Sequence, residues 1–158
     1  MTRKTQFRRK GNKSSKNGGG HQSKTQKNMY PNKMKSKIVQ KFMELLTMIK
    51  LYHWKTHSFA QHKATDELYA KLNENIDQFV EILLGKSKKR VHMLEKHMRM
   101  YDLESKTELK EHIFECRLFL IDMTQMFDSR KDSDLLNIRD EILGDLNQFL
   151  YLLTFDKP

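Results

Sequence analysis

The sequence predicts an all-α protein: a four-helix bundle with one long crossover, preceded by a disordered, basic N-terminal arm. Apolar residues recur at three- and four-residue steps through most of the chain after residue 33, which is the period of an amphipathic helix. The alternation typical of strands is lacking, and the 158 residues include only two prolines. Positive charge gathers at the N-terminus. These observations divide the chain into an arm, residues 1–33, and a bundle, residues 34–158.

The N-terminal arm differs from the rest of the chain in charge and composition. Residues 1–38 hold twelve Lys or Arg and no acid, whereas residues 39–158 hold eighteen basic and twenty acidic residues. The two parts therefore carry +12 and −2, which sum to the net charge of +10. Gly, Ser, Asn and Gln fill the arm up to Pro31, and Phe7 and Tyr30 are its only aromatic residues. Such a segment buries too little surface to offset its chain entropy, so we expect disorder.

Four helices are expected, at about residues 33–56, 60–84, 105–127 and 133–155. Gly85 is a natural stop for the second helix. Ser105 and Glu108 form a capping-box pattern at the start of the third. Asp132 or Ser133 can cap the fourth.

The connections between these helices predict the topology. Short links make the first two helices one antiparallel hairpin and the last two another, and residues 86–104 are long enough to cross the bundle. A short helix within this crossover is expected at about residues 91–100. Two hairpins joined by one long crossover is the ferritin-like arrangement. The third helix is apolar almost all round from Ile113 to Phe127, which indicates a second buried face, such as a subunit contact.

The second helix carries a polar stripe with the chemistry of metal ligands. His62, Asp66, Asp77 and Glu81 fall within about 100° of arc on one side of the helix, and the hairpin can bring His53 close. Imidazole with carboxylates suits iron, zinc or manganese. However, about five turns, roughly 28 Å, separate the ends of the stripe. A metal could therefore bind only across a two-fold interface. Spacing alone favours a solvated polar face, and no His follows a Glu-x-x step, as a di-iron bundle would require.

The stretch LYHWKTHSFAQHKATDELYAKLNENIDQFVEILLG, residues 51–85, resembles the signature of Dps-type mini-ferritins. It has the family's His-Trp pair, then a His with an Asp four residues later, then Asp-x-x-x-Glu. Residues 132–153 are also similar to the family's last helix. The resemblance implies hollow dodecamers that oxidise iron at inter-subunit sites and hold DNA through lysine-rich tails. It makes iron the expected metal, with ligand candidates His53, His62, Asp66, Asp77 and Glu81, and Trp54 beside them.

This chain departs from the family pattern in the hairpin. His53 and His62 are nine residues apart, where the family has a longer loop, so His57 becomes a rival ligand. The basic crossover is also unlike the family's usual link. Either departure is compatible with a fold that has lost iron oxidation, and a viral origin is one explanation of such divergence.

The cations of the arm form the predicted nucleic-acid-binding set. Without one acid among them they favour phosphate, and flexible Gly and Ser spacing favours backbone contact over base readout, so we expect sequence-independent binding to DNA or RNA. Lys86, Lys88, Lys89 and Arg90 form a second basic cluster, or a solvated loop. A capsid-binding, acidic-protein-binding or solubility tail is the alternative reading of the arm. The predicted set is Arg3, Lys4, Arg8, Arg9, Lys10, Lys13, Lys16, Lys24, Lys27, Lys33, Lys35 and Lys37.

Several classes of function are disfavoured. Cys116 is the single cysteine, so no intrachain disulfide or cysteine-based zinc site can form, and we expect it to be a buried small hydrophobe. No apolar run reaches the 18 residues of a membrane span, and the N-terminus lacks a secretory pattern; a transit peptide would need an amphipathic helix that is missing.

The leading functional hypothesis is an intracellular, genome-associated DNA-binding mini-ferritin, oligomeric at least as a dimer, with ferroxidase activity at inter-subunit sites. The alternative is a non-catalytic ferritin-like structural protein that packages a genome or forms part of a virion. A nucleic-acid chaperone without an oligomer is the third hypothesis.

Overall fold

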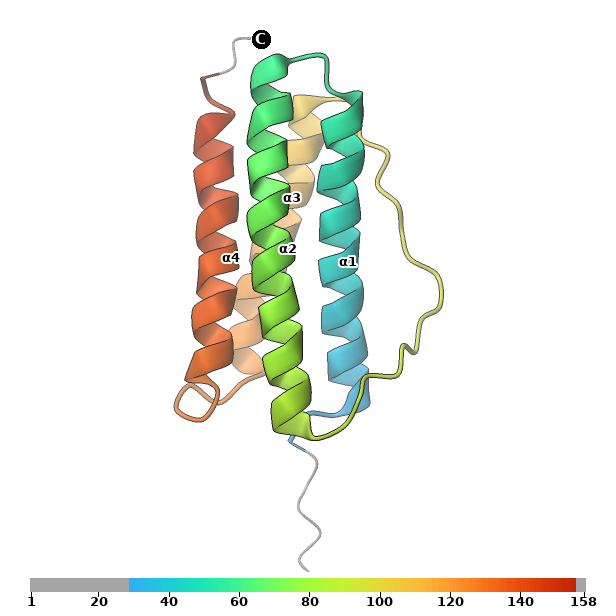
Figure 1. The fold of residues 1–158 in the computed structure, drawn as a ribbon, viewed down its shortest axis with the longest axis vertical. Helices are drawn as coiled ribbons and strands as arrows, with labels where there is room; N and C mark the ends of the chain where they lie inside the picture. Colours follow the sequence, from blue (N-terminus) through green and yellow to red (C-terminus); the bar gives the residue numbers. More distant parts are fainter. Residues whose placement is uncertain (1–28, 156–158) are drawn as a thin grey trace, which may run out of the picture.

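The computed structural model describes residues 29–155, and this part of the chain is entirely helical apart from its connections. It contains α1 (Asn32–Lys55), α2 (Phe59–Ser87), α3 (Lys106–Asp122), a short 3-10 helix η1 (Met123–Gln125) and α4 (Ser133–Leu152) (Figure 1). The predicted all-α, four-helix architecture is confirmed within these residues. The disorder predicted for residues 1–28 lies outside them.

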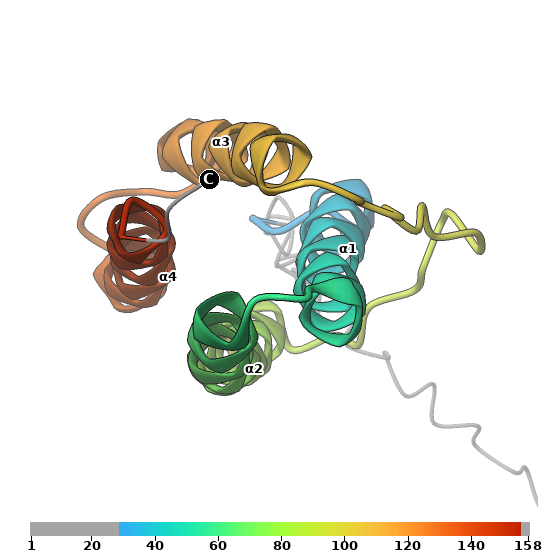
Figure 2. The ribbon, with the colours of Figure 1, turned by 90° about the horizontal axis from the view of Figure 1, so that it is seen from above.

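The four helices form two antiparallel hairpins joined by a long crossover. Residues 56–58 connect α1 to α2, and residues 126–132 follow η1 and lead into α4. The crossover segment, residues 88–105, runs back along the outside of α1 from the end of α2 to the start of α3 (Figure 1). Seen along the bundle, the helices follow the order α1, α2, α4, α3 around the core, and each contacts its two neighbours (Figure 2). The predicted hairpins and crossover are therefore confirmed.

The core is built from the apolar stripes that the periodicity indicated. Ile38, Phe42 and Ile49 of α1 are at most 2 % exposed, and Phe79 of α2 is fully buried. The rings of Phe42 and Phe79 meet edge to face with centroids 5.3 Å apart, and Phe79 meets Phe127 in the same way at 5.9 Å. Burying each such side chain contributes about 1.5–3 kcal/mol.

The crossover segment contains no helix, so the short helix expected at about residues 91–100 is wrong. Side chains of α1 instead bind its backbone: Asn32 pairs with both the N–H and the C=O of His92, at 2.9 and 2.7 Å. One turn further, the Ser36 hydroxyl accepts from the Leu94 N–H at 2.9 Å. These contacts satisfy backbone groups that a helix would have paired internally, and they fix the segment alongside α1.

Three helix ends differ from prediction. Gly85 does not end α2, which continues to Ser87 and stops at Lys88 in the left-handed region with φ 52°. A glycine inside a helix costs about 1 kcal/mol, but Lys86 Nζ offsets this cost by bonding the Lys131 carbonyl at 2.6 Å and Asp134 at 2.8 Å. The capping box predicted at Ser105 is present, although α3 gives way to η1 after Asp122, and α4 ends at Leu152.

The last residues assigned to the arm belong to the fold. Tyr30 is 2 % exposed, its ring packs on Phe127, and its hydroxyl donates to the carboxylate of Asp132. Burial and the hydrogen bond to Asp132 raise the pKa of Tyr30, so the hydroxyl keeps the proton that it donates. Asp132 holds the N-cap position of α4 as predicted, but its side chain does not cap the helix. It accepts from the Asp128 N–H at 3.0 Å and pairs with Lys86 at 3.3 Å.

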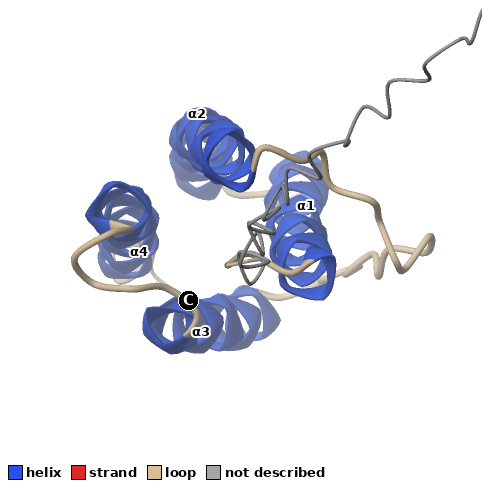
Figure 3. Cartoon of the chain, turned by 90° about the horizontal axis from the view of Figure 1, so that it is seen from below, coloured by secondary structure: helices blue, strands red, loops and turns tan. Residues whose placement is uncertain are grey.

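These contacts converge at one end of the bundle, where α1 begins, α2 ends and the α3–α4 connection turns (Figure 3). We name this the entry end, because the chain enters the fold there. The first hairpin turn, residues 56–58, lies at the other end.

Replacing Tyr30 by Phe should lower the free energy of unfolding by about 1–3 kcal/mol, because a buried carboxylate loses a hydrogen-bond donor while the ring packing is kept. Urea unfolding measures the loss. The matched control is Tyr151→Phe, since Tyr151 is 61 % exposed, and it should stay within about 0.5 kcal/mol of the parent chain. Equal stability of the two variants would contradict the role assigned to Asp132.

Candidate functional site

The first hairpin brings two of the predicted ligands into direct contact. The rings of His53 and His62 stack with centroids 3.9 Å apart. His53 Nδ1 lies 3.0 Å from the His62 carbonyl, and His62 Nδ1 lies 3.0 Å from the His53 carbonyl. Because a carbonyl oxygen can only accept, both Nδ1 atoms carry hydrogen. In the neutral form of each ring the lone pair is then on Nε2, one of the two nitrogens through which an imidazole can bind a metal.

Asp66 completes this group at the surface. Its Oδ1 lies 3.8 Å from His53 Nε2 and 3.8 Å from Lys50 Nζ. His53 is buried, whereas the Asp66 side chain is 57 % exposed. We name His53, His62 and Asp66 the histidine cluster. A cation bound here would have to displace the Lys50 ammonium from its position beside Asp66.

The structure does not bring Asp77 and Glu81 to the histidine cluster. Both are exposed on α2. Asp77 is the nearer of the two to the histidine cluster, and it lies eleven residues, roughly 16 Å, beyond Asp66 along the helix. Among residues 29–155 no three His, Cys, Asp or Glu side chains gather closely enough to hold a metal ion. The rival ligand His57 is exposed in the hairpin turn, where it lines a separate groove with Lys55 and Glu104. Trp54 is 68 % exposed.

The predicted nucleic-acid-binding set is only partly within the described residues. Nine of its twelve cations precede residue 29. Lys33 and Lys37 are exposed at the start of α1, as phosphate binding needs. The prediction that Lys35 binds phosphate is wrong. Lys35 is 2 % exposed, and its ammonium donates to the Ser87 hydroxyl at 3.2 Å and the Lys89 carbonyl at 3.0 Å. It binds the negative end of α2 and is not free for phosphate. Base stacking by Tyr30 is excluded in the same way by its burial.

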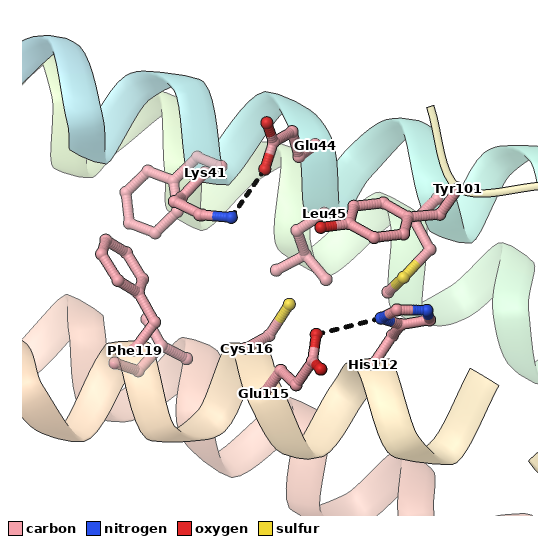
Figure 4. Close-up of a pocket in the computed structure, with 11 residues that line it drawn as sticks. Lys41, Glu44, Leu45, Tyr101, His112, Glu115, Cys116 and Phe119 are labelled. Atoms are coloured by element: carbon pink, nitrogen blue, oxygen red, sulfur yellow. Dashed lines mark hydrogen bonds and ion pairs between the residues drawn. The ribbon is translucent and has the colours of Figure 1, made fainter. Parts of the chain in front are cut away.

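A pocket that the sequence did not indicate lies between α1, α3 and the crossover segment (Figure 4). Its cavity is about 60 Å³. Glu44 of α1 pairs with Lys41 at 2.9 Å on one wall, and Glu115 of α3 pairs with His112 at 3.0 Å on the other. The Cys116 thiol projects between them. Glu108 accepts from the N–H groups of Glu104 and Ser105 at the start of α3, so His112 pairs with Glu115 and not with Glu108.

Burial and hydrogen bonding set the ionisation of this pocket. Desolvation acts to raise the pKa of Glu44, but hydrogen bonds from Lys41 and Gln40 outweigh it and lower the pKa. Desolvation raises the pKa of the Cys116 thiol to about 11. Cys116 packs against the core as the expected small hydrophobe, but it is only partly buried, and its protonated thiol reaches the pocket. A thiol in this state is a poor nucleophile at neutral pH.

The outer face of α3 is apolar, as the sequence indicated. Phe114, Leu118 and Ile121 lie one turn apart and are each about half exposed, at 49, 62 and 48 %. The guanidinium of Arg117 lies 5.0 Å from the centre of the Phe114 ring. One chain leaves this stripe uncovered.

Alkylation of Cys116 at pH 8 should be on the order of a hundredfold slower in the folded chain than in urea, because the raised pKa removes most of the thiolate. The folded rate should rise with pH towards about 11. Mass spectrometry of samples quenched at successive times after adding iodoacetamide measures both rates, and Cys116→Ser provides the blank. A folded rate equal to the unfolded one would show that the thiol is neither buried nor perturbed.

Three comparisons with known proteins bear on this arrangement. No curated protein and no solved structure matches the chain. No helix within residues 29–155 has the length and apolar character of a membrane span. One family model matches residues 53–153, which contain the first hairpin from His53 onward, the crossover segment, α3 and α4. Because this match covers more than half of the 158 residues, the chain belongs to the family described as "Family of unknown function (DUF5856)".

Proposed function

We propose that this protein binds nucleic acid without reading its sequence, and compacts or protects it, by means of a cationic N-terminal arm on a helical bundle. The observation that carries the proposal is charge segregation: +12 in the first 38 residues and −2 in the remainder. A fold needs no such division, because charges of both signs normally mix over a soluble surface. Twelve cations without an acid favour a polyanion as partner.

The internal ion pairs of the fold support this reading. Every ion pair in residues 29–155 joins groups between residues 41 and 145. Lys33 and Lys37 take no part in them.

More specifically, we propose that the protein is a divergent ferritin-like, Dps-type protein that is associated with a genome inside a cell or virion. The helix order, the two hairpins and the single crossover support it. The uncovered stripe of Phe114, Leu118 and Ile121 supports a homo-oligomer, because a half-exposed apolar stripe of this kind is commonly a contact surface. A dodecamer is the size that the resemblance implies.

Iron oxidation is a second candidate function, favoured by the histidine cluster, in which both Nδ1 atoms face a carbonyl and His53 Nε2 lies 3.8 Å from Asp66 Oδ1. One chain does not complete the site, so the proposal requires a second copy to supply Asp77 and Glu81. A two-fold contact between α2 helices running in opposite directions would place these carboxylates against the histidine cluster. The competing reading is a structural bundle in which the same residues are a solvated face.

The arm is tested by replacing the nine Lys and Arg of residues 1–28 with Gln in the full chain, which leaves Tyr30 and the fold intact. If about eight cations meet phosphates in the parent protein, its affinity for duplex DNA should fall with salt with a log–log slope near about −7. The variant should lose most of that slope. Fluorescence anisotropy over a salt series gives both values, and a matched single-stranded RNA identifies the preferred polymer.

The control replaces the six Lys among these nine positions with Arg, which keeps the charge and should keep the slope. Retention of a steep slope by the Gln variant would remove the arm from the proposal. Tight DNA binding in molar sodium chloride by the parent would remove electrostatic binding altogether.

The iron site is tested by complementation between two defective chains. His62→Ala and the double variant Asp77→Ala with Glu81→Ala should each fail to oxidise ferrous iron, because each breaks every shared site. Refolded together, they should recover about a quarter of the parent activity, since half of the random dimers are mixed and each holds one intact site. The rise in ferric absorbance on adding ferrous iron with peroxide measures activity.

Glu67→Ala with Glu74→Ala, two exposed acids on the same helix, is the matched control and should oxidise iron as the parent does. A parent protein without iron oxidation, or a strictly monomeric mass in solution, would leave the structural reading in place of the enzymatic one.

A further inference from the structure

We propose that the folded body carries its own phosphate-binding surface at the entry end, continuous with the arm. This inference rests on the proposed binding of nucleic acid and adds a second contact to it. The surface, named the basic end, consists of Lys33, Lys88, Lys89, Arg90, Arg130 and Lys131, all of them exposed. Its ligand is the sugar-phosphate backbone of a nucleic acid.

Three segments that are distant in sequence meet to form the basic end. Lys86 Nζ donates to the Lys131 carbonyl at 2.6 Å, which joins the last turn of α2 to the α3–α4 connection. The Asn32 side chain holds the backbone of His92, which joins the start of α1 to the crossover segment. Lys35 Nζ reaches the Lys89 carbonyl at 3.0 Å. The cations are therefore gathered by packing on a fixed surface, and Tyr30, whose hydroxyl donates to Asp132, brings the chain into the fold at the same place.

The acids of the α3–α4 connection are already engaged. Asp128 accepts from the backbone N–H groups of Arg130 and Lys131, at 3.0 and 2.9 Å, and these bonds lower its pKa. Asp132 is buried and holds Tyr30 and Lys86. Asp134 also pairs with Lys86, at 2.8 Å. Lys86 thus pairs with both of these acids and offsets one of their two charges.

The six cations of the basic end, in contrast, have no carboxylate partner within ion-pair distance in the described part of the chain. Glu81 is the one acid that lines the groove at the end of α2, which has a volume of about 430 Å³ and is also lined by Leu84, Gly85, Lys88, Lys89 and Arg90. The local excess of positive charge is what a phosphate backbone would neutralise.

Helix electrostatics explains only half of this excess. Lys88, Lys89 and Arg90 follow the C-terminus of α2, where cations stabilise a helix. Lys33 lies in the first turn of α1, where a cation is unfavourable, and this turn has no acid and no side-chain cap. Arg130 and Lys131 lie just before the N-terminus of α4. Half of the basic end therefore opposes helix stability, and an anionic ligand gives these residues a physical role.

The test uses the full chain with Lys89, Arg90 and Lys131 replaced by Gln. Each phosphate contact on duplex DNA contributes about 0.9 to the log–log salt slope, so the slope should become shallower by about 1–3. The matched control replaces Lys63, Lys96 and Lys110 by Gln, which removes the same charge away from the entry end. Its slope should stay close to the parent value. Anisotropy with one fixed DNA duplex measures all slopes, and thermal unfolding checks that each variant is folded.

The arm variant described above separates this inference from the function on which it rests. A reduced slope in both variants supports both contacts. A reduced slope in the arm variant alone, with the basic-end variant and its control alike, overturns the basic end and leaves the arm as the binding element. The opposite result keeps the basic end and overturns the arm, and unchanged slopes in both variants overturn both.

Discussion

The buried carboxylate of Asp132 is the contact on which the arrangement of the entry end depends. Taking a charge out of water is costly unless hydrogen bonds and an opposite charge replace the lost solvent. Tyr30, Lys86 and the Asp128 N–H supply these, and each comes from a different segment. One side chain therefore fixes the point where the chain enters the bundle, the last turn of α2 and the turn before α4. The basic end exists because these three segments are held together.

Polar groups along one side of α1 have a comparable effect on the topology. Asn32 and Ser36 bind the backbone of the crossover segment near its start, and Lys55 pairs with Asp102 at 2.7 Å near its end. The segment is thereby stretched over the length of the bundle. As a result α3 begins at the end opposite the entry end and runs parallel to α2. The pocket beneath Tyr101 is a consequence of the same placement, since the segment closes over the gap between α1 and α3.

Hydrophobic periodicity was sufficient to predict the helices, the hairpins and the crossover, because these depend on apolar stripes that many residues repeat. It failed where a polar residue occupies a stripe position. Lys35 lies three residues before Ile38 and seven before Phe42, so it falls on the buried face of α1. Because it is a cation, it was nevertheless included in the predicted nucleic-acid-binding set. Glu44 was likewise missed, although it is 4 % exposed. Whether such a residue is buried depends on partners that are distant in sequence. The partners of Lys35, which are Ser87 and Lys89, cannot be inferred from the pattern of α1. For the histidine cluster, spacing predicted the approach of His53 to His62, but the stacking and the proton on each Nδ1 follow only from the hairpin backbone.

If both proposed functions hold, α2 would couple them. Glu81, a candidate ligand, lies in the same groove as Lys88, Lys89 and Arg90, so the positive potential there opposes the approach of a metal cation. A phosphate backbone on the basic end would neutralise this potential and strengthen the attraction of Glu81 for a cation. Binding of either ligand would then favour the other, because a coupling free energy between two sites is reciprocal. In a two-fold pair of α2 helices, the histidine cluster of one copy faces this groove of the other, so iron affinity would depend on whether nucleic acid is bound. A protein that only packages nucleic acid has no need of that dependence, and its presence or absence distinguishes the two readings on physical grounds.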